Sequence, residues 1–341
     1  MIVISCVDAG SANFLLPVIP LIKQEVVFFT SGSATEIFDS ADVTSQKIET
    51  IDWIELREVA KDIVEKINPD LLLCGTSWGL SLDKALTLEA KKFGITTIST
   101  IDHWRLLRER YIDTSESVST GELTFITDFV FAIDNKVKQS IVGYGIDSSR
   151  VFVVGNPHLE FIENTYSNLN ARVPHRKAYS KDILFVSEIV RDDLPNNPYD
   201  EYGVLEDLLS LSISLGLTLD IKLHPNEHTS KFSSLVSQSI YINKDIDYFK
   251  MVSEYKFIVG MDSMLLFEMS ICRPRVISYR PNCANESNNL FDSSSVLTAY
   301  TYSELESLCQ SGLDKPFSCE KKYGGSAVTV SDYIDDLMEL V

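Results

Sequence analysis

Two short motifs in the second half of the chain place polar side chains where a phosphate could bind. In the segment Lys222-Leu223-His224-Pro225, proline keeps the preceding residue out of helical geometry, so the histidine ring should project from the end of an expected strand. A histidine there can donate to a phosphate, or bond to nearby backbone in a plain turn. We predict that His224, with Lys222 beside it, binds the phosphate of a ligand.

The second motif runs from Gly260 to Glu268, with Asp262 and Ser263 at the expected start of a helix. The first N–H groups of a helix lack partners within it and attract anions. Ser263 adds a hydroxyl at this point, and Glu268 lies where a carboxylate can accept two ribose hydroxyls. A plain helix cap by Asp262 or Ser263 is the simpler interpretation, and it is compatible with phosphate binding.

The turn after the first expected strand, Asp8-Ala9-Gly10-Ser11-Ala12-Asn13, consists of small residues that let a ligand approach the backbone. It lacks the Gly-x-Gly-x-x-Gly pattern of a dinucleotide site. Asp8 is either a general base or a cap of this turn. We assign Gly10 to donor binding and Asn13 to acceptor binding.

A fourth segment, Asp102-His103-Trp104-Arg105, also follows an expected strand. An adjacent Asp and His make a candidate base, because each group can tune the pKa of the other. Trp104 offers a face for stacking on a sugar ring, and Arg105 can hold an anionic acceptor. The alternative is a cap-and-turn pair, with Trp104 in the core and the arginine on a solvated helix face.

These loops follow apolar, β-branched runs that alternate with helical patterns, which is typical of βαβ units and parallel sheets. The expected strands of the first half are Ile2–Val7, Val26–Thr30, Leu71–Cys74, Thr96–Thr100, Phe129–Ile133 and Val151–Val154. Those of the second half are Asp182–Val186, Thr218–Leu223, Ser239–Ile242, Phe257–Val259 and Arg275–Ser278. Expected helices between strands include Asn13–Ile22 and Ser230–Ser237.

The length of 341 residues fits two domains. We predict an α/β fold of two doubly wound, Rossmann-like domains that face each other across a cleft. The first covers residues 1–157, a connection covers 158–181, and the second covers 182–341, with a last helix that can pack back on the first domain. Ligands of open parallel sheets bind at the carboxyl ends of the strands, so the function is expected there.

Composition excludes several classes of protein. The net charge of −19 does not fit the basic face of a nucleic-acid-binding protein. The six cysteines form no Cys-x-x-Cys pair, so we expect neither a zinc site nor a disulfide framework. No apolar run reaches the roughly 18 residues of a membrane helix, and the N-terminus lacks the basic start of a signal peptide. We expect a cytoplasmic protein without bound metal, and leave peripheral membrane association open.

The motifs in the second half resemble a known family. A strand ending in Lys-Leu-His-Pro, followed by Gly-x-x-Ser and a helical Glu five residues on, is similar to the donor half of GT-B glycosyltransferases. The resemblance points to enzymes of bacterial capsule and lipopolysaccharide assembly, including sialyl- and Kdo-transferases and polyglycerol-phosphate transferases. The segment 154–157, Val-Gly-Asn-Pro, is similar to the interdomain Gly-Asn-Pro of these enzymes and of non-hydrolysing UDP-sugar 2-epimerases.

This resemblance implies a metal-independent glycosyltransferase that needs no cofactor beyond its activated-sugar donor. Such an enzyme would move a sugar from a nucleotide donor to a glycan or a lipid-linked acceptor. His224 and Ser263 would contact the donor phosphate, and Glu268 the ribose. Asp8 or Asp102, the latter with His103, would act as the base.

Three alternatives remain at this point. They are a sugar-nucleotide epimerase or hydrolase of the same fold, a phosphoribosyl-type transferase, and a non-catalytic scaffold protein. Asp262 stands before Ser263 where epimerases carry a longer Gly-rich run, which disfavours epimerisation. The first loop lacks the His or Asp-Gly pattern of several relatives, so the base stays unassigned.

Overall fold

A computed structural model describes residues 1–49, 52–113, 122–172, 179–235, 240–244, 246–272, 275–283, 295–310 and 323–339. Its contacts divide the chain into two compact units. The first unit comprises Met1–Phe161 and Lys322–Val341, and the second comprises Ile162–Lys321. Each unit is a parallel sheet with helices, which confirms the predicted α/β class.

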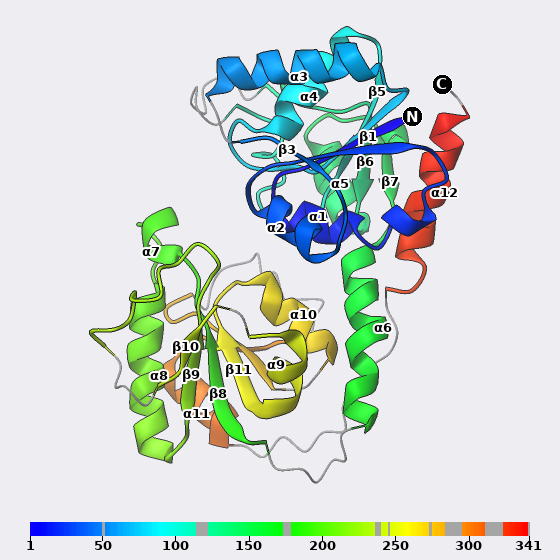
Figure 1. Cartoon of the computed structure of the whole chain (residues 1–341). Helices are drawn as coiled ribbons and strands as arrows, with labels where there is room; N and C mark the ends of the chain where they lie inside the picture. Colours follow the sequence, from blue (N-terminus) through cyan, green and yellow to red (C-terminus); the bar gives the residue numbers. More distant parts are fainter. Residues whose placement is uncertain are drawn as a thin grey trace. The chain divides into compact units, whose positions relative to one another are not determined.

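The first unit contains seven parallel strands in the order β3-β2-β1-β4-β5-β6-β7 (Figure 1). The strands are β1 (Ile2–Cys6), β2 (Val26–Thr30), β3 (Gln46–Lys47), β4 (Leu71–Cys74), β5 (Thr96–Thr100), β6 (Phe129–Ala132) and β7 (Val151–Val153). All residues of β1 and β4 are buried, as expected of central parallel strands covered on both faces. The strand order reverses between β1 and β4. At such a switch point the loops after neighbouring strands form the usual ligand site.

Helices connect these strands. They are α1 (Ala9–Leu15), η1 (Ile19–Leu21), α2 (Gly32–Ser40), α3 (Trp53–Ile67), α4 (Leu82–Lys92), α5 (Asn135–Gly143) and η2 (Ser148–Arg150). A further helix, α6 (Pro157–Arg172), follows β7, and the boundary between the two units lies within it. The expected helix Asn13–Ile22 was misplaced, since α1 begins at Ala9 and ends at Leu15. The reason is the pair Pro17 and Pro20, because proline has no N–H for the helical hydrogen-bond ladder.

The last helix, α12 (Ser326–Met338), belongs to the first unit, although the expected second domain extended to residue 341. Val330 and Ile334 are buried in the core of the first unit. Tyr333 packs on Phe152 of β7, with ring centroids 4.6 Å apart. In Figure 1, α12 is the red helix beside β7. Apolar burial on the first unit therefore decides where this segment folds.

The second unit contains six parallel strands in the order β10-β9-β8-β11-β12-β13. The strands are β8 (Lys181–Val186), β9 (Leu219–Lys222), β10 (Ile242–Asn243), β11 (Tyr255–Gly260), β12 (Val276–Tyr279) and β13 (Leu297–Ala299). The helices are α7 (Val190–Asp193), α8 (Glu201–Leu215), α9 (Tyr248–Glu254), α10 (Met264–Cys272) and α11 (Tyr302–Gln310). The order reverses between β8 and β11. Strand β13 was not expected, and residues 229–235 form turns where a helix was predicted to begin at Ser230.

Candidate functional site

In the first unit, the loops after β1, β4 and β5 meet at the switch point. The Asp102 carboxylate lies so close to Gly10 that a Cβ added there would be 1.9 Å from Asp102 Oδ2. The buried Arg110 donates from Nη1 to Asp102 Oδ1 at 2.9 Å and to the Thr76 carbonyl oxygen at 2.5 Å. Glycine is required at position 10 because the space of its side chain is taken by a carboxylate.

Asp8 and Asp102 are electrostatically coupled at this edge. Burial and the charge of Asp102 raise the pKa of Asp8 to about 6, while Arg110 and Lys84 oppose the shift. Asp102 is ion-paired with Arg110. Two neighbouring carboxylates of which one holds its proton up to near-neutral pH can act as an acid and a base. This arrangement favours acid–base chemistry over a simple cap of the turn.

His103 and Trp104, which follow Asp102, make hydrogen bonds within the first unit. His103 accepts a hydrogen bond at Nδ1 from the Arg105 backbone N–H at 2.9 Å, which closes a turn. Trp104 packs against the core and donates from Nε1 to Asp134 Oδ2 at 2.5 Å. The Arg105 side chain is exposed, and Asn13 is half-buried on α1. These contacts match the turn alternative for His103 and hold the Trp104 ring in place, whereas the Asp102 carboxylate is bound by Arg110.

A buried polar pair at the start of α4 escaped the sequence analysis. Asp83 is 2% exposed and accepts from Ser5 Oγ at 2.6 Å, while its Oδ2 has no hydrogen-bond partner among the described residues. Burial raises the pKa of Asp83 to about 8. Burial lowers the pKa of Lys84 to about 8, and its Nζ donates to the Ile112 carbonyl oxygen at 3.0 Å. The sequence shows only charged residues in the first turn of a helix, a pattern typical of solvent exposure.

In the second unit, Ser263 caps α10 as its hydroxyl oxygen accepts from the Leu265 N–H at 3.2 Å. Glu268, on the same helix, is 7% exposed and accepts a hydrogen bond from the Tyr248 hydroxyl. Ser263 thus stands at the helix N-terminus that follows β11, as predicted from the motif. Such a cap is compatible with the predicted anion site, because a cap satisfies only part of the free N–H groups.

Glu188, in the loop after β8, reaches the same helix N-terminus. Its Oε1 accepts from the backbone N–H groups of Met261 at 3.0 Å and Asp262 at 2.8 Å. Burial and the charge of Asp262 raise the pKa of Glu188 to about 7, although these hydrogen bonds oppose the shift. A glutamate in a loop gives no sequence signal for such a role. A negative charge therefore already lies beside the site predicted for a phosphate.

His224 begins the loop after β9. Its backbone N–H donates to Glu227 Oε2 at 2.7 Å, and its Nδ1 accepts from the Asn226 N–H at 3.2 Å. With Nδ1 as an acceptor, the proton of the neutral ring is on Nε2, which is the tautomer that donates to a phosphate. Lys222 donates from Nζ to the Lys244 carbonyl oxygen at 2.8 Å, so its ammonium group joins β9 to the loop after β10.

A buried arginine also lies at the edge of the second sheet. Arg280 follows β12, is 2% exposed, and donates from Nη1 to Asp262 Oδ1 at 3.4 Å. The Tyr199 hydroxyl donates to the other oxygen of Asp262. Arg280 therefore supplies positive charge near the start of α10, where Glu188 and Asp262 supply negative charge. From the sequence, Arg280 could either supply local positive charge beside the last expected strand or lie on the surface; its burial depends on the packing of the strands.

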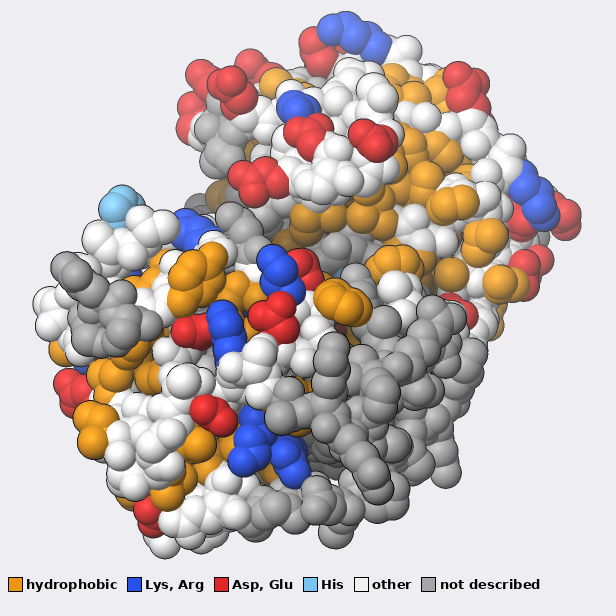
Figure 2. Space-filling view, turned by 60° about the horizontal axis from the view of Figure 1, so that its bottom comes forward, with side chains coloured by type: hydrophobic (Ala, Val, Ile, Leu, Met, Phe, Trp, Pro, Cys, Tyr) orange, Lys and Arg blue, Asp and Glu red, His pale blue; other side chains and the backbone are white. Residues whose placement is uncertain are grey.

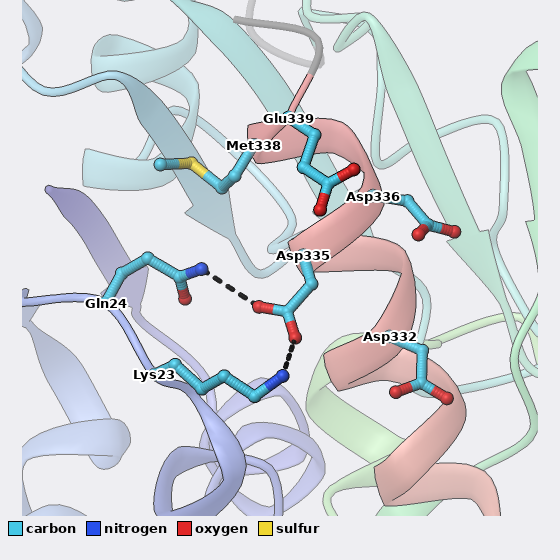
Figure 3. A pocket seen from close by; sticks show the side chains of 7 residues that line it. All are labelled: Lys23, Gln24, Asp332, Asp335, Asp336, Met338 and Glu339. Carbon is cyan, nitrogen blue, oxygen red and sulfur yellow. Dashed lines mark hydrogen bonds and ion pairs between the residues drawn. The ribbon is translucent and has the colours of Figure 1, made fainter.

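A surface pocket of about 760 Å³ lies elsewhere on the first unit, against α12 (Figure 3). Its lining residues are Lys23, Gln24, Asp332, Asp335, Asp336, Met338 and Glu339. Lys23 Nζ and Gln24 Nε2 both donate to Asp335, at 2.6 and 2.9 Å. The pocket is acidic and contains none of the predicted site residues, so it does not suit an anionic ligand.

Other expectations concern metals, membranes and surface charge. Among the described residues, no group of three or more His, Cys, Asp or Glu could hold a metal ion. Within the same part of the chain, no helix has the length and apolar character to cross a bilayer. On the face drawn in Figure 2, Lys and Arg side chains lie in small groups among acidic ones.

Solved structures share the fold along the whole chain, whereas neither a protein-family model nor a curated protein matches it. The UDP-GlcNAc 2-epimerase of Methanocaldococcus jannaschii, in complex with UDP-GlcNAc and UDP, is 14% identical, with a TM-score of 0.70 over 99% of both chains. The Neisseria meningitidis UDP-GlcNAc 2-epimerase bound to UDP-GlcNAc is 14% identical, with a TM-score of 0.68 over 98% of this chain and 100% of that one. The glycotransferase of kitacinnamycin is 12% identical, with a TM-score of 0.56 over 99% of this chain and 98% of that one.

These likenesses confirm the GT-B fold and correct the expected activity. The prediction of a surface-polysaccharide glycosyltransferase was wrong, since the better-matching structures are UDP-GlcNAc 2-epimerases. The physical reason is that a helix N-terminus and a histidine at a strand end serve any phosphate-activated sugar, so these motifs report the ligand site and leave the reaction open.

Proposed function

We propose that this chain binds a nucleotide-activated sugar and converts it without a sugar or lipid acceptor, as an epimerase or hydrolase. The observation that carries the proposal is the full-length likeness to UDP-GlcNAc 2-epimerases, two of which hold UDP-GlcNAc in their structures. A likeness over one unit alone would support only a shared Rossmann-like domain. Here the matches cover both units, so the proposal concerns the whole chain.

We assign the nucleotide and its phosphates to the second unit. Ser263 and the N-terminus of α10 offer hydroxyl and N–H donors. His224 adds a donor at Nε2, because its Nδ1 is an acceptor in its own turn. The Glu268 carboxylate is held by the Tyr248 hydroxyl and remains an acceptor for ribose hydroxyls. Together these groups offer hydrogen-bond donors to the phosphates and an acceptor to the ribose of a nucleoside diphosphate.

We assign proton transfer to the first unit. In epimerisation at the carbon beside the anomeric carbon, a base takes the C–H proton while the electron pair of that bond expels the nucleoside diphosphate and forms a C=C bond. An acid then returns a proton to the opposite face as the diphosphate adds back to the anomeric carbon, so both a base and an acid are required. The Arg110-paired Asp102 serves as the base, and Asp8, with its pKa of about 6, serves as the acid. In hydrolysis, the same Asp102 carboxylate would take a proton from the water that attacks the sugar carbon as the bond to phosphate breaks.

The decisive experiment is incubation with UDP-GlcNAc and other nucleotide sugars in D₂O, without any acceptor, followed by proton and phosphorus NMR. An epimerase produces a second sugar nucleotide with deuterium at the inverted carbon, whereas a hydrolase releases nucleoside diphosphate and free sugar. The Asp102→Asn variant should be inactive while still binding nucleotide. Turnover that requires an added acceptor, or binding of no nucleotide at all, would refute the proposal.

A substitution tests the nucleotide site separately. His224→Ala should weaken UDP binding by about 1.5–3 kcal/mol, the scale of a hydrogen bond to a charged group. The matched control is His228→Ala, because His228 is exposed in the same loop and its ring bonds to Ser230. Isothermal titration calorimetry gives both affinities. An equal loss in the two variants would remove His224 from the site.

A further inference from the structure

A buried carboxylate lies behind the His224 loop. Glu227 is 4% exposed and accepts the His224 backbone N–H with Oε2 at 2.7 Å. Its other oxygen accepts from Ser187 Oγ at 2.8 Å, and Ser187 directly follows β8. One side chain therefore bonds to the loops after two neighbouring strands, β8 and β9, at the edge where ligands of parallel sheets bind.

Glu227 shares a largely buried lysine with a second carboxylate, Glu201. Lys231 Nζ lies 2.5 Å from Glu227 Oε1 and 2.6 Å from Glu201 Oε1. Glu201 is fully buried, and its Oε2 accepts from the backbone N–H groups of Val190 and Arg191 at 3.1 and 3.0 Å. The two carboxylates and the ammonium thus form one hydrogen-bonded chain that runs from the His224 loop to α7.

A buried network of this kind restricts the conformation of the loops that it joins more than it adds to the free energy of unfolding. Buried ion pairs gain little over apolar packing, because desolvation offsets their attraction, but a fully bonded network permits few arrangements of its loops. The orientation of the His224 ring is fixed by its hydrogen bond to the backbone of the same loop, and the position of the His224 backbone is fixed by its hydrogen bond to Glu227. A shift of the loop would displace Nε2 from any phosphate it contacts, and hydrogen bonds depend steeply on such displacement.

We propose that Glu227 is a positioning residue, which holds the His224 and Ser187 loops in the conformation that receives the nucleotide phosphates. The inference rests on the proposed nucleotide site and adds the residue that prepares it before the ligand arrives. Glu227 acts through His224 and does not itself touch the ligand.

A double-mutant cycle with UDP as the probe tests this role. Calorimetry would compare Glu227→Ala, His224→Ala and the double variant with the unmodified protein. Glu227→Ala should weaken UDP binding about 10-fold, and should cause no further loss once His224 is alanine. Glu227→Gln should bind more tightly than Glu227→Ala, because its amide oxygen still accepts the His224 N–H, although its amide nitrogen cannot accept from Ser187 Oγ or Lys231 Nζ. A purely structural effect would lower the affinity equally in both backgrounds.

The outcomes separate the two proposals. Unchanged affinity in Glu227→Ala, or an equal loss in both backgrounds, overturns the positioning role and leaves the nucleotide site intact. A loss of binding in Glu227→Gln as large as in Glu227→Ala also overturns it. If the unmodified protein binds no nucleotide, the proposed function fails first. Should Glu227→Ala not fold, Glu227→Asp takes its place in the cycle, because its shorter side chain cannot keep both loop contacts.

Discussion

The buried carboxyl group of Asp83 leads to the sharpest prediction about stability. Its pKa is about 8 in the folded chain against 3.8 for the free side chain, because burial disfavours the charged form. The folded state therefore binds a proton that the unfolded state has already lost at any pH between these values. Stability from this group is fully present below pH 3.8 and decreases as the pH rises toward 8.

The substitution Asp83→Asn should remove this dependence. Asparagine keeps the acceptor oxygen for Ser5 Oγ, which lies 2.6 Å away, and carries no titrating proton. Each pH unit changes the free energy of unfolding by about 1.4 kcal/mol per proton, so between pH 5 and pH 7.5 the change is about 3 kcal/mol. The variant should gain that amount relative to the unmodified protein over this interval.

The measurement is urea unfolding at the two pH values, followed by tryptophan fluorescence. All three tryptophans, Trp53, Trp78 and Trp104, lie in the first unit, as Asp83 does, so the signal reports the relevant transition. Carboxyls with raised pKa that do not interact with Asp83 contribute alike to both proteins and cancel in the difference, whereas Asp8 and Lys84 are coupled to Asp83. A stability difference that stays the same at pH 5 and pH 7.5 would show that Asp83 is ionised in the folded chain.

Three further predictions concern activity and binding. Asp8→Asn should reduce turnover of the nucleotide sugar by at least about 100-fold, the usual contribution of a general acid. The pH–rate profile of the variant should also lose any change of slope near pH 6. If that change of slope remains, a group other than Asp8 causes it. Gly10→Ala should abolish turnover in a protein that still unfolds cooperatively, because its Cβ would lie 1.9 Å from Asp102 Oδ2; an active variant would place Asp102 outside the site. Affinity for UDP-GlcNAc should fall as the pH rises through 7, because Glu188 then becomes negatively charged. Calorimetry on Glu188→Gln should give an affinity that does not change with pH over this range. If the affinity of the variant falls with pH as that of the unmodified protein does, Glu188 is not the cause.

The sheets were predictable because their strands are short, apolar and β-branched, and the carboxyl ends of parallel strands share one edge. That rule alone places Asp8, Asp102 and Ser263 at the correct edges of their sheets. Local details depended on packing and hydrogen bonding that the pattern does not contain. The helix α1 lies earlier than expected because Pro17 and Pro20 end it.

Three charged residues whose burial the sequence did not predict share a physical feature. Arg110, Asp83 and Glu227 are charged side chains that the fold buries, and each is bound or enclosed by residues distant in sequence or by backbone. A charged residue in a helix or loop is normally exposed, so its type gives no hint of such burial. The reaction was mispredicted for a related reason, since a phosphate-binding motif specifies the ligand's phosphates and leaves the chemistry at the sugar undefined.

The helix α12 comes last in the sequence but packs on the first unit, and this order has a consequence for synthesis in the cell. The core of the first unit is closed by Val330 and Ile334, which follow the second unit in the chain. A nascent chain must therefore present an unfinished first unit, with the Phe152 ring uncovered on its α12 side, until the second unit has left the ribosome. The exposed apolar surface makes this interval the period of greatest aggregation risk during folding.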